Sequence, residues 1–199
     1  MSPPVGLLRL VHVVDARGAA DRARLGTLLS NGVTALWLRD PAATGRVLHD
    51  AGLVLRALTA EAGALLLVGD RPDVALAVEA DGVQLGHRAV PPEHVRSWYR
   101  GRLGVSCHDA SDLRAAAAAG ADHVMLSPLF AVPGKGAPLG LEGFAALLTA
   151  TSLPVVALGG VTPATVGAVR SLGVAGVAVA RALSDVADPA TAARALSSR

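Results

Sequence analysis

Two side chains stand out as groups that could act on a bound ligand: His108 and Lys135, which is the chain's only lysine. His108 follows a short apolar segment, and histidine can accept or donate a proton near neutral pH. Lys135 lies in an irregular stretch of residues 127–140 that begins with Ser127 and is rich in proline and glycine. Long loops in compact domains are usually functional, so this loop is predicted to hold Lys135 over an anion. A solvated histidine and a plain surface loop are the alternatives.

A second group of residues has the composition of a phosphate site. Gly159-Gly160 can expose backbone N–H groups, and Thr162-Pro163 is expected to open a helix. Ala180-Arg181 follows another apolar segment, and arginine makes charge-assisted contacts with phosphate. Helix N-termini bind anions, so these segments together predict phosphate binding. The alternative is that the glycines only permit a tight turn and that Arg181 is solvated.

Other polar and aromatic residues lie at the ends of the remaining apolar segments, and these residues are predicted to bind substrate. Asp70 could hold a cation or a substrate amine, or could pair with Arg71. Trp37 lies between two leucines and either packs in the core or walls the pocket, while His87 is placed at the rim. The predicted substrate-binding residues are Trp37, Arg39, Asp70, Gln84, Ser127 and Lys135.

One local pattern must position these residues, because it occurs four times: a helix end, usually with glycine, then a short apolar strand, then polar residues. It occupies residues 31–40, 79–87, 119–128 and 172–181. Repeated helix–glycine–strand units indicate parallel strands joined by helices. Eight strands are predicted, at residues 7–14, 34–39, 65–68, 82–85, 103–106, 123–126, 155–158 and 176–179. Helices are predicted at residues 20–30, 44–61, 72–78, 92–99, 142–149, 163–171 and 189–196, with an alanine-rich helix capped by Asp109 or Ser111.

Eight such units in 199 residues predict an α/β chain that forms one (β/α)8 TIM-barrel domain over residues 1–199. The active site of that fold lies at the carboxyl ends of the strands, where the residues above would meet. A doubly wound open sheet is the alternative. It would ordinarily use fewer strands, and no Gly-x-Gly-x-x-Gly motif follows the first one.

Composition excludes several classes of protein. Aromatic residues make up only 3% of the chain, which argues against base-stacking surfaces, and its arginines are scattered, so no nucleic-acid partner is expected. No apolar run is long enough for a membrane helix, and the start Met-Ser-Pro-Pro does not resemble a signal peptide. Cys107 is the only cysteine, so the expected setting is the reducing cytoplasm. A homodimer is compatible with the sequence, which does not fix the oligomeric state.

The strand-end segments together resemble the family that contains thiamine phosphate synthase and the thiazole tautomerase TenI. The resemblance spans nearly the whole chain. It rests on motifs that include Gly69-Asp-Arg-Pro-Asp-Val-Ala75, Ala80-Asp-Gly-Val-Gln-Leu-Gly86, Gly104-Val-Ser-Cys-His108 and Leu158-Gly-Gly-Val-Thr-Pro163. It implies a (β/α)8 barrel that binds phosphorylated thiamine precursors.

This chain departs from the synthase pattern at four places. The Gln-x-Arg-x-Lys after the second strand is here Trp37-Leu-Arg39-Asp-Pro41, and the Asn-Asp after the third is Gly69-Asp70. A second magnesium carboxylate is replaced by Ala89, and the loop Thr-x-Thr-Lys is here Val132-Pro-Gly-Lys135. Magnesium and basic groups stabilise a departing pyrophosphate, so these losses disfavour synthase chemistry.

The resemblance to TenI-like proteins predicts a thiazole tautomerase that needs no cofactor and no metal. In that hypothesis His108 is the acid/base, and the phosphorylated thiazole is held by Gly159, Gly160, Ala180 and Arg181, with Arg39 and Lys135 against its carboxylate. The first alternative is a divergent thiamine phosphate synthase that uses magnesium, with Asp70 as its remaining ligand. The second alternative is a non-catalytic protein that binds a phosphorylated ligand.

Overall fold

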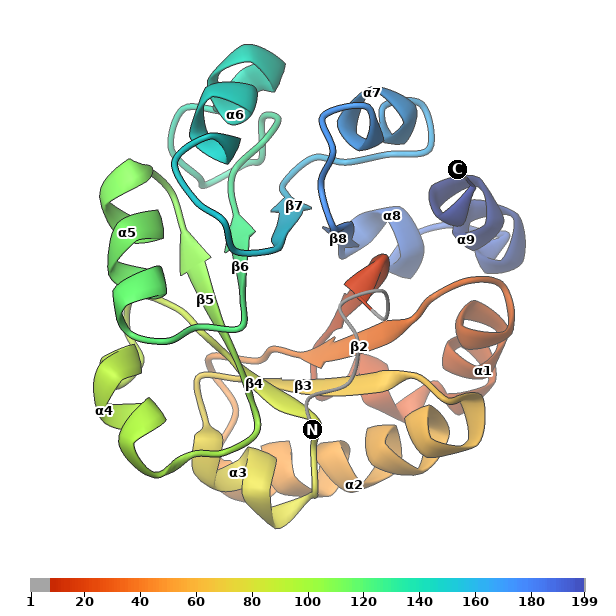
Figure 1. The fold of residues 1–199 in the computed structure, drawn as a ribbon. Helices are drawn as coiled ribbons and strands as arrows, with labels where there is room; N and C mark the ends of the chain where they lie inside the picture. Colours follow the sequence, from red (N-terminus) through yellow and green to blue (C-terminus); the bar gives the residue numbers. More distant parts are fainter. Residues whose placement is uncertain (1–7, 199) are drawn as a thin grey trace.

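The structure is a computed structural model that describes residues 8–198, in which eight parallel strands close into a barrel (Figure 1). The strands follow one another in sequence order, and the last pairs with the first. This closure confirms the predicted (β/α)8 barrel and excludes the open sheet, whose edge strands would stay unpaired. The strands are β1 (Leu10–Val14), β2 (Ala35–Leu38), β3 (Leu65–Gly69), β4 (Gly82–Leu85), β5 (Arg102–Cys107), β6 (His123–Leu126), β7 (Val155–Leu158) and β8 (Gly176–Val179).

Helices surround the barrel and connect its strands (Figure 1). Asp109, one of the two proposed caps, does cap its helix, since its side chain accepts the Asp112 amide at 2.9 Å. No helix among the described residues is long and apolar enough to cross a membrane. The helices are η2 (Gly18–Ala20), α1 (Arg22–Ser30), α2 (Gly45–Ala62), α3 (Pro72–Ala77), α4 (Pro92–Trp98), α5 (Ala110–Ala118), α6 (Gly140–Leu148), α7 (Val166–Arg170), α8 (Arg181–Ser184) and α9 (Pro189–Ser197).

Three differences from the expected elements affect the site or its surroundings. The helix predicted from Pro163 begins only at Val166, because the Thr162 amide donates to the Thr165 hydroxyl at 3.0 Å in a turn that precedes it. The four-residue α8 was not predicted, since one turn gives no periodic pattern. Residue 7, where the first strand was predicted to start, and the Met-Ser-Pro-Pro start lie outside the described residues.

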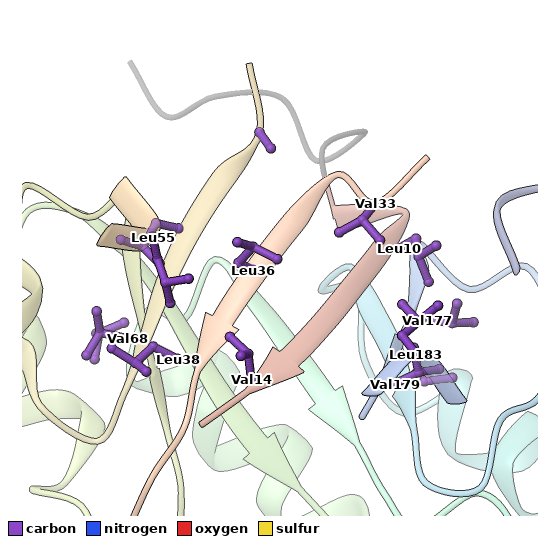
Figure 2. Close-up of a cluster of buried hydrophobic side chains, with 14 of the residues drawn as sticks. Leu10, Val14, Val33, Leu36, Leu38, Leu55, Val68, Val177, Val179 and Leu183 are labelled. Carbon is purple, nitrogen blue, oxygen red and sulfur yellow. The ribbon is translucent and has the colours of Figure 1, made fainter. Parts of the chain in front are cut away.

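Alternation along the strands builds two apolar layers on either side of the barrel wall. The outer layer joins the strands to the helices, and Figure 2 shows part of it, with Leu36 and Leu38 of β2 and Leu55 of α2. The inner layer fills the barrel and includes Val11, Leu67, Met125, Val156 and Ala178. The strand ends are therefore held by packing on both faces.

One sector of the barrel interior is polar instead of apolar. Gln84 on β4, Arg102 on β5 and His123 on β6 are all buried. Gly104 leaves the space they occupy, because a Cβ there would lie 2.1 Å from the Gln84 Oε1 atom and 2.5 Å from the His123 ring. The sequence-based prediction placed Gln84 at the ligand, whereas the structure buries it in this interior sector.

Candidate active site

A cavity of about 380 Å³ opens where the strands end, a size typical of small-molecule sites. Every strand contributes to its lining, either from its last residues or from the loop that follows it. Gln84, Gly160 and Arg181 are not among the lining residues, although each lies next to one that is. The predicted site residues that do line it are Trp37, Arg39, Asp70, His108, Ser127, Lys135, Gly159 and Ala180.

His108 is held in one orientation by the chain that follows β6. Its Nδ1 lies 2.6 Å from the carbonyl oxygen of Ser127, which can only accept a hydrogen bond. Nδ1 therefore carries the hydrogen, and the lone pair of the neutral ring is on Nε2. Asp112 fixes the backbone of the same residue by accepting the His108 amide at 2.8 Å. The arrangement leaves one ring nitrogen to exchange protons.

A second imidazole lies against the first. The ring centroids of His87 and His108 are 4.7 Å apart, and their planes differ by 20°. His87 Nε2 is 3.8 Å from Asp112 Oδ2, so a protonated His87 has a counter-ion. The sequence placed His87 only at the rim of the site. Its position just after β4 indicates a role in the site, because active-site residues of this fold follow the strands.

Three cationic side chains line the same cavity: Arg39, Arg88 and Lys135. Within residues 8–198, the guanidinium groups of Arg39 and Arg88 form neither a hydrogen bond nor an ion pair. Arg39 instead lies over the Trp37 ring, with its Cζ 5.8 Å from the ring centroid. Among the described residues, Asp70 is the only carboxylate that lines this cavity, so the site favours an anionic ligand.

The loops after β7 and β8 form part of the cavity wall through Gly159 and Ala180. Gly159 and Gly160 have φ angles of +107° and +69°, a region that favours glycine. A Cβ on Gly160 would lie 2.7 Å from the Cβ of Phe130, so the loop also packs closely against the segment after β6. The amides of Gly160 and Val161 donate to no other group in residues 8–198. These glycines therefore permit the turn beside the cavity, and the two amides that follow Gly159 are without a partner among the described residues.

The helix terminus nearest to this wall differs from the predicted one. Ala180 lines the cavity and is the N-cap of α8, which begins at Arg181. The phosphate sites of (β/α)8 barrels commonly use the loops after the seventh and eighth strands and a short extra helix. Arg181 is exposed and does not line the cavity, so of these two predicted residues only Ala180 contributes to its wall.

Ser106 connects the cavity to the polar interior. Its hydroxyl lies 3.2 Å from Gln84 Nε2, an amide nitrogen that can only donate. The Ser106 oxygen accepts that hydrogen bond, so its own proton is free to point toward a ligand in the cavity that Ser106 lines. Gln84, predicted to bind substrate, thus reaches the cavity through Ser106.

The side chains near Asp70 fit a magnesium ion poorly. Asp70 Oδ1 already accepts the Gly86 amide at 2.7 Å. A smaller adjoining cavity of about 260 Å³ adds Asp40, but Arg39, Arg71 and Arg88 also line it. Among the described residues, no three His, Cys, Asp or Glu side chains come together as they would around a metal.

Comparison with known proteins gives consistent matches over most of the chain. The family model described as thiamine monophosphate synthase matches residues 10–183. The thiamine-phosphate synthase of Chloroflexus aurantiacus is 39% identical over 195 residues, which cover 94% of this chain and 90% of that protein. The thiamine-phosphate synthase of Laribacter hongkongensis is 42% identical over 173 residues, which cover 84% of this chain and 82% of that protein. The solved structure of thiamine phosphate pyrophosphorylase from Pyrococcus furiosus matches with a TM-score of 0.89 at 33% identity, over 96% of this chain and 95% of that one.

Proposed function

The chain belongs to the thiamine monophosphate synthase family, and we propose that within it this protein isomerises a phosphorylated thiazole by proton transfer. The substrate is the thiazole carboxylate phosphate tautomer, which the reaction converts to the aromatic thiazole. The observation that supports this proposal is the geometry of His108, with Nδ1 anchored to the Ser127 carbonyl and Nε2 left to exchange a proton at the cavity. The relatives named above carry the name of a synthase, which supports a second candidate discussed below.

The reaction removes one proton from a carbon of the substrate and adds one at another carbon. In the proposed step, His108 Nε2 takes the proton, the C–H electron pair enters the ring system, and the exocyclic carbon is protonated. No bond to a leaving group breaks and no electrons leave the substrate. The reaction therefore requires a base, an acid and groups that bind the substrate. The side chains of this cavity can supply all three.

Two groups of residues would supply the binding energy. The amides of Gly160 and Val161, with the start of α8, would hold the phosphate. Arg39 and Lys135 would lie against the carboxylate, where their charges stabilise the negative charge that develops as the proton leaves. Trp37 lines the cavity between these groups and provides an apolar wall for the ring.

The first test gives the purified protein the thiazole carboxylate phosphate tautomer without metal and follows aromatisation by ultraviolet absorbance. His108→Gln should lower turnover about 1,000-fold, within the usual range for loss of a general acid or base. Binding of the aromatic product, measured by calorimetry, should change little in that variant. The exposed His94 on α4 gives a matched control, and His94→Gln should leave turnover unchanged.

Two outcomes would contradict the tautomerase. One is a wild-type protein that does not accelerate aromatisation, and the other is a His108→Gln variant with wild-type turnover. The first result transfers the proposal to the second candidate, and the second rejects His108 as the acid/base.

The second candidate is a thiamine phosphate synthase that joins hydroxymethylpyrimidine diphosphate to thiazole phosphate. It is favoured by the names of the relatives, including the solved structure at 33% identity. The test is pyrophosphate release from these two substrates with magnesium present. Release that needs both substrates would support the synthase, whereas no release would reject it.

A further inference from the structure

We propose that His87 is a second proton carrier of this site, paired with His108 so that one imidazole removes the substrate proton while the other delivers one. The inference rests on the proposed isomerisation and assigns a role to a residue that the sequence left at the rim. Both imidazoles line the cavity, and their centroids are 4.7 Å apart.

The anchoring of His108 is the first argument for a second group. Because Nδ1 donates to the Ser127 carbonyl at 2.6 Å, the ring exchanges protons only through Nε2. The Asp112 carboxylate also fixes the His108 backbone. A histidine fixed at its backbone and at Nδ1 serves one substrate carbon well, yet the isomerisation changes the protonation of two.

The placement of His87 is the second argument. Its ring stacks on that of His108 with the two planes 20° apart, and both residues line the cavity. The side chain is 58% exposed, which leaves its nitrogens accessible to the cavity and to water. His87 Nε2 is 3.8 Å from Asp112 Oδ2, and this carboxylate provides the counter-ion when His87 is protonated.

The proton balance closes over one turnover. Neutral His108 accepts a proton from the first carbon and becomes an imidazolium, while protonated His87 gives its proton to the exocyclic carbon and becomes neutral. The substrate loses one proton and gains one. Solvent water then takes the proton from His108 and returns one to His87, which restores the starting state.

The discriminating variant is His87→Phe, which keeps a planar ring for stacking but has no nitrogen to carry a proton. We expect turnover to fall about 100-fold, with product binding changed by less than about threefold. His94→Gln is the matched control for removing an exposed histidine elsewhere. Wild-type turnover in His87→Phe would show that the ring only stacks, and would overturn the inference while leaving the tautomerase intact.

An isotope experiment tests the same inference without any substitution. The tautomer is labelled with deuterium at the carbon that loses its proton, and the product is examined by mass spectrometry. Two separate carriers predict a product with no deuterium at the exocyclic carbon, because the label leaves on His108 and the new proton comes from His87. Label found there would overturn the inference, since one imidazole would then have done both transfers. A wild-type protein without turnover would instead overturn the proposed function, and this inference with it.

Discussion

The histidines at the mouth of the barrel differ from those inside its wall. His87 and His108 both line the open cavity at the strand ends. His12 and His123 are buried, and burial lowers the pKa of His12 to about 4 and that of His123 to about 3. The charge of Arg102 lowers the His123 pKa further, so that ring stays neutral in the folded protein.

The comparison shows that the residue type alone does not define a proton carrier. The four side chains have the same chemistry, and their positions along the strands decide what they can do. A histidine at the carboxyl end of a strand faces the mouth, whereas one within a strand is enclosed by packing. The two nitrogens of His123 have no hydrogen-bond partner among the described residues, and Gly104 provides the space for the ring.

The largest expected effect comes from filling the polar interior. Gly104→Ala places a Cβ 2.1 Å from Gln84 Oε1 and 2.5 Å from the His123 ring, so the buried side chains must shift. We expect the free energy of unfolding to fall by about 3 kcal/mol, as in overpacked cores. Urea unfolding measures it. Gly26→Ala is the control, because a Cβ there meets nothing within 4 Å and alanine favours a helix, so a small gain is expected.

A smaller loss in Gly104→Ala, below about 0.5 kcal/mol, would contradict this account of the interior. It would mean that Gln84 and His123 move aside freely, and that the polar sector is not a fixed part of the scaffold.

The next effect is the dependence of stability on pH. The folded-state pKa of His123 is about 3, below the ordinary value of 6.5, so below pH 6.5 the unfolded chain binds a proton that the folded chain does not. The stability contributed by this neutral histidine is therefore lost as pH falls from 6.5 toward 3. Between pH 7 and pH 5 the loss is about 2 kcal/mol.

His123→Leu removes this titration while keeping an apolar group of similar size in the barrel. The measurement is the free energy of unfolding of both proteins at pH 7 and pH 5. The wild-type protein should lose about 2 kcal/mol more than the variant over that interval. Equal losses would show that His123 titrates normally and is not enclosed as described.

The smallest effect is expected at Ser106, where the cavity meets the polar interior of the barrel. Ser106→Ala removes the acceptor of the Gln84 amide, whose Nε2 lies 3.2 Å from the Ser106 hydroxyl, and leaves that buried donor unpaired. The free energy of unfolding should fall by about 1 kcal/mol. The matched test is Ser106→Ala in a Gln84→Met background, where the loss should disappear. A loss of the same size in both backgrounds would show that the two side chains are not coupled.

Much of the fold could be predicted from the sequence because its signals are local. The apolar strands and the repeated helix–glycine–strand units indicate the elements, and their number indicates the barrel. The active site of a (β/α)8 barrel lies at the carboxyl ends of its strands. This principle predicted most of the residues that line the cavity, including His108, Asp70 and Lys135. Whether a predicted residue such as Gln84 lines the cavity depends on which face of its strand points inward and how far the cavity extends.

What the sequence by itself determined is therefore the order and type of the elements and the set of residues at the strand ends. Only the tertiary structure decided how those residues are used. The barrel brings the Ser127 carbonyl to His108, places His87 against its ring and places Ala180, the N-cap of α8, at the cavity. Each of these contacts joins atoms from different strands or loops, so its geometry follows from barrel closure and side-chain packing, which no local pattern encodes.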